Sequence, residues 1–68
     1  MNVRKLKGRM LEEGVTQELL AKSLGSSRST VHRRLNEHPD ELTVGEAKKI
    51  SRLLRLSDTD KLQIFFDQ

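Results

Sequence analysis

The side chains with the greatest capacity for specific hydrogen bonding gather between residues 28 and 36, in the run RSTVHRRLN. An arginine presents a planar fork of donors that can contact guanine O6 and N7 together, and a serine can contact either a base or a phosphate. Catalytic chemistry is not indicated, because the chain has no Cys, no Gly-rich phosphate loop and carboxylates grouped only in exposed acidic runs. We therefore expect a binding protein and not an enzyme.

The segment 16–36, TQELLAKSLGSSRSTVHRRLN, contains the elements that must position these side chains. Thr16 is a favourable helix N-cap, Ala21 is small enough for another helix to come close, and Gly25 can adopt the positive φ of a sharp turn. Val31 follows Gly25 by six residues and provides an apolar contact back to the first helix. This spacing predicts helices over 17–24 and 28–37 that cross steeply, a helix-turn-helix whose second helix is presented to the DNA major groove.

Helical spacing extends over the whole chain, and no segment alternates with period two. We predict further helices over 2–13, over 44–54 behind a capping box of Thr43 and Glu46, and over 58–66 behind Ser57 as the cap. The expected fold is all-α, with five helices in a single domain over 1–68. The side chains expected to face the core are Val3, Leu6, Met10, Leu20, Ala21, Leu24, Val31, Leu35, Ala47, Ile50, Leu54, Leu62 and Phe65.

The length of 68 residues and the composition exclude several classes of protein. Without Cys no disulfide can form, and two histidines, His32 and His38, cannot close a structural zinc site without carboxylates. We expect no metal and no cofactor. No apolar run is long enough for a membrane span or a signal peptide, and a chain of this size cannot enclose a substrate pocket. We therefore expect a cytoplasmic protein with neither a membrane nor a small molecule as its partner.

The charge of the chain is unevenly distributed. The formal net charge is +3 and the sequence pI is about 9.7. Residues 1–36 hold eight Lys or Arg against three Glu, whereas residues 37–68 hold five basic and seven acidic side chains. One basic half in a small domain favours a polyanionic partner.

The residues Gln17, Ala21, Gly25 and Val31 resemble the helix-turn-helix core of the phage repressor and Cro-like family, also called the XRE family. The resemblance covers essentially the whole chain and implies a five-helix lambda-repressor-like domain. Two features depart from the family pattern. Ser26 stands where Val or Ile is common, and the loop 37–41 is acidic where many relatives carry basic phosphate contacts.

The resemblance implies a sequence-specific regulator that binds double-stranded operator DNA and blocks a promoter. By family position, Arg28, Ser29 and Arg33 are expected to contact bases. The expected phosphate contacts are Gln17, Ser27, Thr30, His32, Arg34 and Asn36. Whether Lys5, Lys7 and Arg9 follow the phosphates or form an exposed helix face is left open.

The apolar residues near the end of the chain suggest self-association. Ile64 and Phe66 are candidates for a homodimer patch, although both could instead pack against neighbouring helices. With no ligand or protease-switch domain expected, the chain resembles a Cro-like or excisionase-like bacterial or phage regulator, associated with the nucleoid of the bacterial host when bound, more than a full-length repressor. Two alternatives stay open, namely a phage modulator that binds a repressor protein, favoured by the acidic second half, and an antitoxin.

Overall fold

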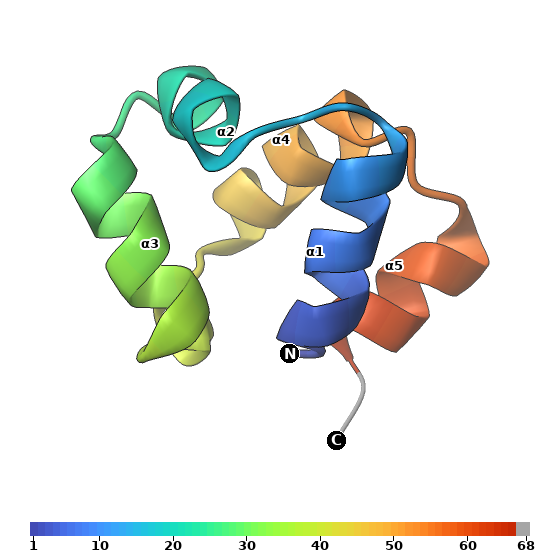
Figure 1. The fold of residues 1–68 in the computed structure, drawn as a ribbon. Helices are drawn as coiled ribbons and strands as arrows, with labels where there is room; N and C mark the ends of the chain where they lie inside the picture. The colour runs from blue at the N-terminus through green and yellow to red at the C-terminus, as the bar shows by residue number, and fades with distance from the viewer. Residues whose placement is uncertain (67–68) are drawn as a thin grey trace.

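A computed structural model of the chain describes residues 1–66, which form five α-helices and one short 3-10 helix (Figure 1). No strand occurs among these residues. The predicted all-α class and the order of five helices are confirmed. The elements are α1 (Val3–Glu12), α2 (Gln17–Leu24), α3 (Arg28–Asn36), the 3-10 helix η1 (Pro39–Glu41), α4 (Val44–Leu53) and α5 (Asp58–Phe65).

Side-chain caps determine where the helices begin. The hydroxyls of Thr16, Ser27 and Thr43 each accept a hydrogen bond of 3.1 Å from the backbone N–H three residues further on. Glu46 completes the predicted capping box by accepting from the Thr43 N–H at 3.0 Å. Each cap stabilises its helix by about 1 kcal/mol. At the other end of α2, Gly25 has a φ of 66°, the left-handed conformation that ends a helix.

The helix boundaries differ from the predictions by a single residue at several ends. Asn2 does not begin α1 but caps it, because its side-chain oxygen accepts from the Lys5 N–H. Helices α1, α3, α4 and α5 each end one residue earlier than expected. The acidic loop is more ordered than predicted, since Pro39 begins a turn of 3-10 helix there.

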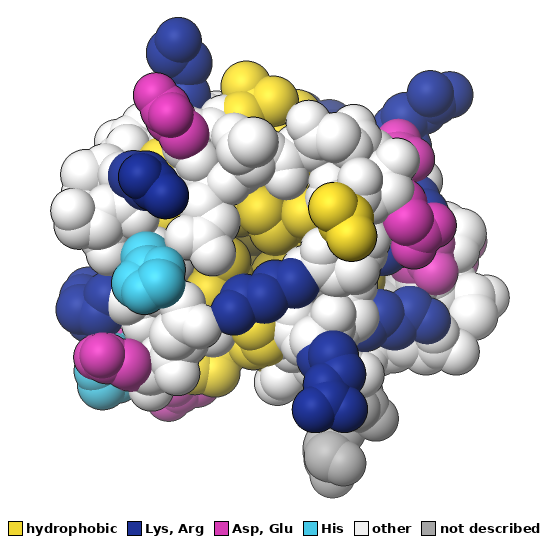
Figure 2. All heavy atoms as spheres, in the orientation of Figure 1, with side chains coloured by type: hydrophobic (Ala, Val, Ile, Leu, Met, Phe, Trp, Pro, Cys, Tyr) yellow, Lys and Arg dark blue, Asp and Glu magenta, His cyan; other side chains and the backbone are white. Residues whose placement is uncertain are grey.

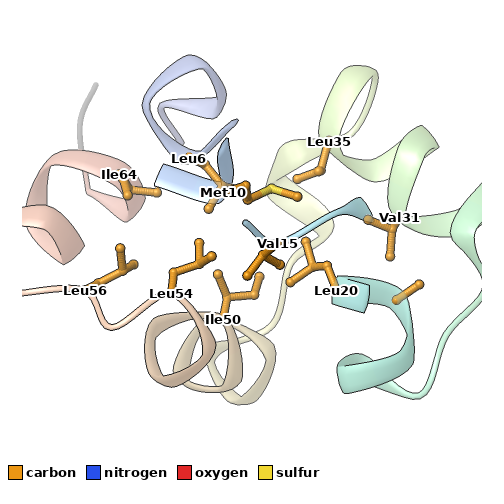
Figure 3. Packing of buried hydrophobic residues seen from close by; sticks show 11 residues of the cluster. Leu6, Met10, Val15, Leu20, Val31, Leu35, Ile50, Leu54, Leu56 and Ile64 are labelled. Atoms are coloured by element: carbon orange, nitrogen blue, oxygen red, sulfur yellow. The ribbon is translucent and has the colours of Figure 1, made fainter. Parts of the chain in front are cut away.

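The core lies between the helices and contains apolar side chains from all five (Figure 3). Residues recurring at helical spacing supply it, such as Leu6 and Met10 of α1 or Val31 and Leu35 of α3. Fully burying one such side chain contributes about 1.5–3 kcal/mol to folding. The complete buried set is Leu6, Met10, Val15, Leu20, Ala21, Val31, Leu35, Ile50, Leu54, Leu56 and Ile64.

The predicted orientation of the last helix is wrong for two of its residues. Leu62, which was expected in the core, is 61% exposed, whereas Ile64 is fully buried. Phe65 packs against the core as expected. The first turn of α5 faces α1 through Asp60, which lies 3.9 Å from Arg9. Ile64 follows one turn later on the same face, and its carbonyl accepts a 2.6 Å hydrogen bond from the backbone N–H of residue 2.

The C-terminal correction affects the proposed dimer patch. Ile64 cannot form part of it without leaving the core, so the expectation for this residue is not met. Phe66 is exposed as predicted and remains a candidate, together with its exposed neighbour on α5, Leu62.

The packing places α3 at one edge of the molecule and α5 at the opposite edge, with α1 and α4 between them (Figure 1). Helix α2 packs against both α3 and α4, and α1 packs against α5. The second helix of the predicted motif is thus supported from behind, with one long side open to solvent. Within the described part of the chain, no helix has the length and apolar character needed to cross a membrane.

Candidate nucleic-acid interface

The turn between α2 and α3 is closed by backbone hydrogen bonds. The N–H of Ser26 donates to the carbonyl of Ala21 at 2.9 Å, and the N–H of Gly25 donates to Lys22 at 3.2 Å. Ala21 and Val31 are both buried in the common core, as the spacing predicted. Ser26 therefore departs from the usual apolar residue without opening the turn, because its backbone and not its side chain makes the closing contact.

One face of α3 is exposed along its length and is called here the outward surface of α3. Ser29, Arg33 and Asn36 point away from the buried side chains Val31 and Leu35, His32 lies to one side, and Arg28 is exposed because it stands at the start of the helix. In Figure 2, basic and histidine side chains lie over the edge formed by α3, and acidic side chains lie near its lower end. The predicted base contacts are all on this face. The outward surface consists of Arg28, Ser29, His32, Arg33 and Asn36.

Three of the predicted phosphate contacts are linked in one hydrogen-bond network. Gln17 Oε1 lies 3.2 Å from His32 Nδ1, and Asn36 Nδ2 lies 3.3 Å from the same ring nitrogen. Asn36 Nδ2 also donates to the backbone carbonyl of His32 at 2.7 Å. This network extends to α1, because Lys7 Nζ donates to Asn36 Oδ1 at 2.7 Å. Hydrogen bonds thus link the N-terminus of α2, the middle of α3 and a cation of α1.

The N-terminus of α3 adds a further polar site. The hydroxyls of Ser27 and Thr30 lie 2.8 Å apart, and Ser27 also accepts from the Thr30 N–H. Arg28 is exposed at the first position of the helix, and within residues 1–66 it has no ion-pair partner. The unpaired N–H groups of a helix start carry a partial positive charge that favours an anion.

Arg33 and Arg34 are neighbours in sequence with different partners. Arg33 lies 3.4 Å from Glu41 of η1, and both side chains are more than 40% exposed. Arg34 points toward α4 and donates to Glu46 Oε2 at 2.6 Å in a mostly buried pair. A phosphate contact by Arg34, as the sequence suggested, would require this pair to break.

Glu46 connects two helices and is the centre of what we call the α3–α4 seam, formed by Arg34, Thr43 and Glu46. The backbone N–H of Thr43 hydrogen-bonds the Glu46 carboxylate and is the main reason why its pKa lies below the usual 4.5. The hydrogen bond from Arg34 lowers that pKa further, against the opposing effect of burial. One carboxylate thus caps α4 and holds α3 against it.

The outward surface of α3 follows from the sequence, but three contacts of α3 with other elements were missed. Lys7 was left undecided, and neither Glu41 nor Glu46 was connected with an arginine of α3. The acidic character of loop 37–41 was the only signal for Glu41. No group of three or more potential metal ligands lies close together within residues 1–66.

Comparison with known proteins supports the arrangement described above. The family described as helix-turn-helix matches residues 6–61, which include α2, the turn, α3 and most of the flanking helices. No match was found among curated proteins or among solved structures.

Proposed function

The chain belongs to this helix-turn-helix family, that of the phage repressor and Cro-like DNA-binding proteins, and we propose that it regulates transcription by binding an operator. The family is DNA-binding and not enzymatic. The observation that carries the proposal is the outward surface of α3, where Arg28 and Arg33 are exposed while the opposite side of the helix is buried.

In the proposed complex, α3 enters the major groove and three of its side chains contact bases. Arg28 and Arg33 are long enough to reach guanine, and each bidentate contact is worth about 1–3 kcal/mol of discrimination. Ser29 contacts a base or a neighbouring phosphate. The phosphate contacts are assigned to Gln17, Ser27, Thr30, His32 and Asn36, now joined by Lys7, and to Arg34 only if it leaves Glu46.

The proposal extends to a homodimer that blocks a promoter in the cytoplasm of a bacterial host, on a site with two half-sites. Phe66 supports it, since it is 73% exposed and lies one turn after Leu62, which is 61% exposed, so that two large apolar side chains face solvent on the same side of α5. Analytical ultracentrifugation at tens of micromolar is expected to show self-association that Phe66→Ala weakens. Leu11→Ala is the matched control, because Leu11 is 84% exposed on α1. Equal behaviour of both variants would contradict a dimer through Phe66.

Fluorescence anisotropy tests the proposed function. Duplex DNA from upstream of the gene is compared with a scrambled duplex at several salt concentrations. We expect preference for the upstream DNA and an affinity that falls with salt, with a log–log slope of about −0.9 for each phosphate neutralised. Binding without preference at any salt would contradict an operator-binding role.

The second candidate function is a modulator that binds a repressor protein through the α3 edge. It is favoured by the acidic loop beside α3, where Glu37, Asp40 and Glu41 are all exposed and oppose a DNA backbone. A pull-down with the repressor encoded nearby, made with and without operator DNA, separates this candidate from direct binding to the operator.

A further inference from the structure

A groove of about 510 Å³ runs between α4 and α5, and no residue of α1, α2 or α3 lines it. Its floor is apolar and includes Val44, Phe65 and Phe66. Val44 is 75% exposed at one side, and Phe66 is 73% exposed at the other. Two large apolar side chains thus face solvent in one groove that the DNA-binding helices do not form.

The border of this groove is basic. Lys48 and Arg52 from α4, Arg55 after it and Lys61 from α5 all line it. Lys61 has an acidic neighbour, Asp58, at 3.7 Å. Within residues 1–66, none of the other three cations is paired with a carboxylate. No acidic side chain lines the groove at all among the described residues.

The apolar floor and the basic border together indicate which kind of molecule the groove can bind. A second copy covering the whole groove would bring two sets of the same four cations together, which opposes that arrangement and limits the proposed dimer contact to Phe66 itself. A DNA backbone would meet the cations but leave Val44 and Phe65 against phosphates, whereas protein contacts with DNA are mainly polar and charged. An acidic amphipathic helix satisfies both parts of the surface.

We propose that the α4–α5 groove binds an acidic amphipathic helix of another protein, with two or three apolar side chains on the floor and carboxylates at the basic border. The stretch of α4 from Val44 to Arg52 is about 12 Å long, which matches just over two turns of a docked helix with apolar residues at i, i+4 and i+7. The groove and the outward surface of α3 share no residue, so the partner and DNA use different surfaces, whereas the partner and the proposed homodimer both use Phe66.

The probe is a fluorescein-labelled peptide of fourteen residues with leucines at i, i+4 and i+7, glutamates beside them and alanines at the remaining positions, so that it can form a helix. Anisotropy is measured with the full chain, beside a peptide of the same composition whose leucines no longer share a face. We expect saturable binding of the first peptide, at least tenfold tighter than that of the second. Absence of binding at millimolar chain, or equal binding of both peptides, would overturn the proposal.

Adjacent lysines of α4 provide a matched pair of variants. Lys48 lines the groove and Lys49 does not, although both are exposed. Lys48→Glu is expected to weaken peptide binding by about fivefold, whereas Lys49→Glu leaves it within twofold. Val44→Glu should abolish binding, with circular dichroism confirming that this exposed change leaves the fold intact.

Measurements with DNA separate this surface from the operator-binding one. The affinity for upstream DNA is expected to be the same in Lys48→Glu and Lys49→Glu. A selective loss of DNA affinity in Lys48→Glu would make the groove part of the DNA interface and overturn the proposal. If the upstream DNA is not bound at all, the proposed function fails, while the peptide titration still tests independently whether the groove binds an acidic helix.

Discussion

Arg33 on the outward surface of α3 and Arg34 in the α3–α4 seam are successive residues in different surroundings. The Arg33 side chain is 46% exposed and lies 3.4 Å from Glu41, whereas Arg34 is 26% exposed and hydrogen-bonds Glu46 at 2.6 Å. A rotation of about 100° per residue is sufficient to separate them. The first cation is available to a polyanion, and the second is held by a carboxylate that also caps the next helix.

A basic run in a recognition helix is therefore not uniformly a binding surface. Arg34 in the seam holds α3 against α4, and Arg33 on the outward surface is thereby held facing solvent. Substitutions at the two positions should therefore affect different quantities, namely DNA affinity for Arg33 and stability for Arg34.

The largest expected effect is on DNA binding. Arg33→Glu removes the proposed base contact and places a negative charge in the proposed major-groove interface, so affinity for upstream DNA should fall about 100-fold. The thermal midpoint should stay close to that of the unmodified chain. Lys49→Glu makes the same charge change on α4, away from α3, and should lose less than threefold. Similar losses in both variants would mean that net charge, and not the outward surface, controls affinity.

The second prediction concerns the seam. Arg34→Ala leaves the mostly buried carboxylate of Glu46 without its partner and should lower the free energy of unfolding by about 1–3 kcal/mol. Arg33→Ala, the matched variant one residue earlier, should change it by less than about 0.5 kcal/mol. Urea denaturation followed by circular dichroism measures both. Equal stability of the two variants would remove the distinction between seam and outward surface.

The third prediction is the pH dependence of the seam. The pKa of Glu46 is lowered in the folded chain, chiefly by the Thr43 N–H. The ionised carboxylate therefore stabilises the folded chain fully above pH 4.5, and this stabilisation is lost as the pH falls through the lowered pKa. Glu46→Gln keeps a side chain that can cap α4 but lacks the charge. At pH 7, the free energy of unfolding of the unmodified chain should exceed that of Glu46→Gln by about 1 kcal/mol.

The two proteins should become equal in stability at acid pH. Asp60, whose pKa is also lowered, chiefly by the Ser57 N–H, titrates in both proteins and does not affect the difference. A stability gap that persisted unchanged to pH 2 would show that the charge of Glu46 is not the cause.

The smallest expected effect comes from the acidic loop. Glu41→Gln removes the ion pair with Arg33 and one negative charge beside the proposed DNA interface, so affinity for upstream DNA should rise about two- to threefold. Glu18→Gln is a control on α2, where the side chain is exposed and unpaired within residues 1–66. A weaker complex in the Glu41 variant would mean that this pair positions Arg33 and does not restrain it.

Local signals in the sequence were sufficient for the helices and for the outward surface. Thr16, Ser27 and the Thr43–Glu46 pair are caps whose effect depends on residues within one turn, and the structure forms each of them. The buried pair Val31 and Leu35 defines one side of α3, so the exposed opposite side follows from helical geometry alone.

Signals that depend on a distant helix were not available from the sequence. Whether Arg34 is exposed depends on where α4 lies, and nothing near residue 34 specifies that position. The same reason explains the wrong prediction for α5, where Leu62, Ile64, Phe65 and Phe66 offer apolar residues on every side. Asp60 near Arg9 and the buried Ile64 lie on the same side of α5, and both contacts depend on the position of α1, which is remote in sequence.

The measurement that tests the central claim most directly is an NMR titration of the isotope-labelled chain with upstream duplex DNA. We predict the largest shifts at the backbone amides of 28–33 and at the side chains of Arg28 and Arg33, while Arg34 keeps the signals of its pair with Glu46. Shifts confined to loop 37–41 or to the α4–α5 groove, with α3 unmoved, would contradict the claim that the outward surface of α3 binds DNA.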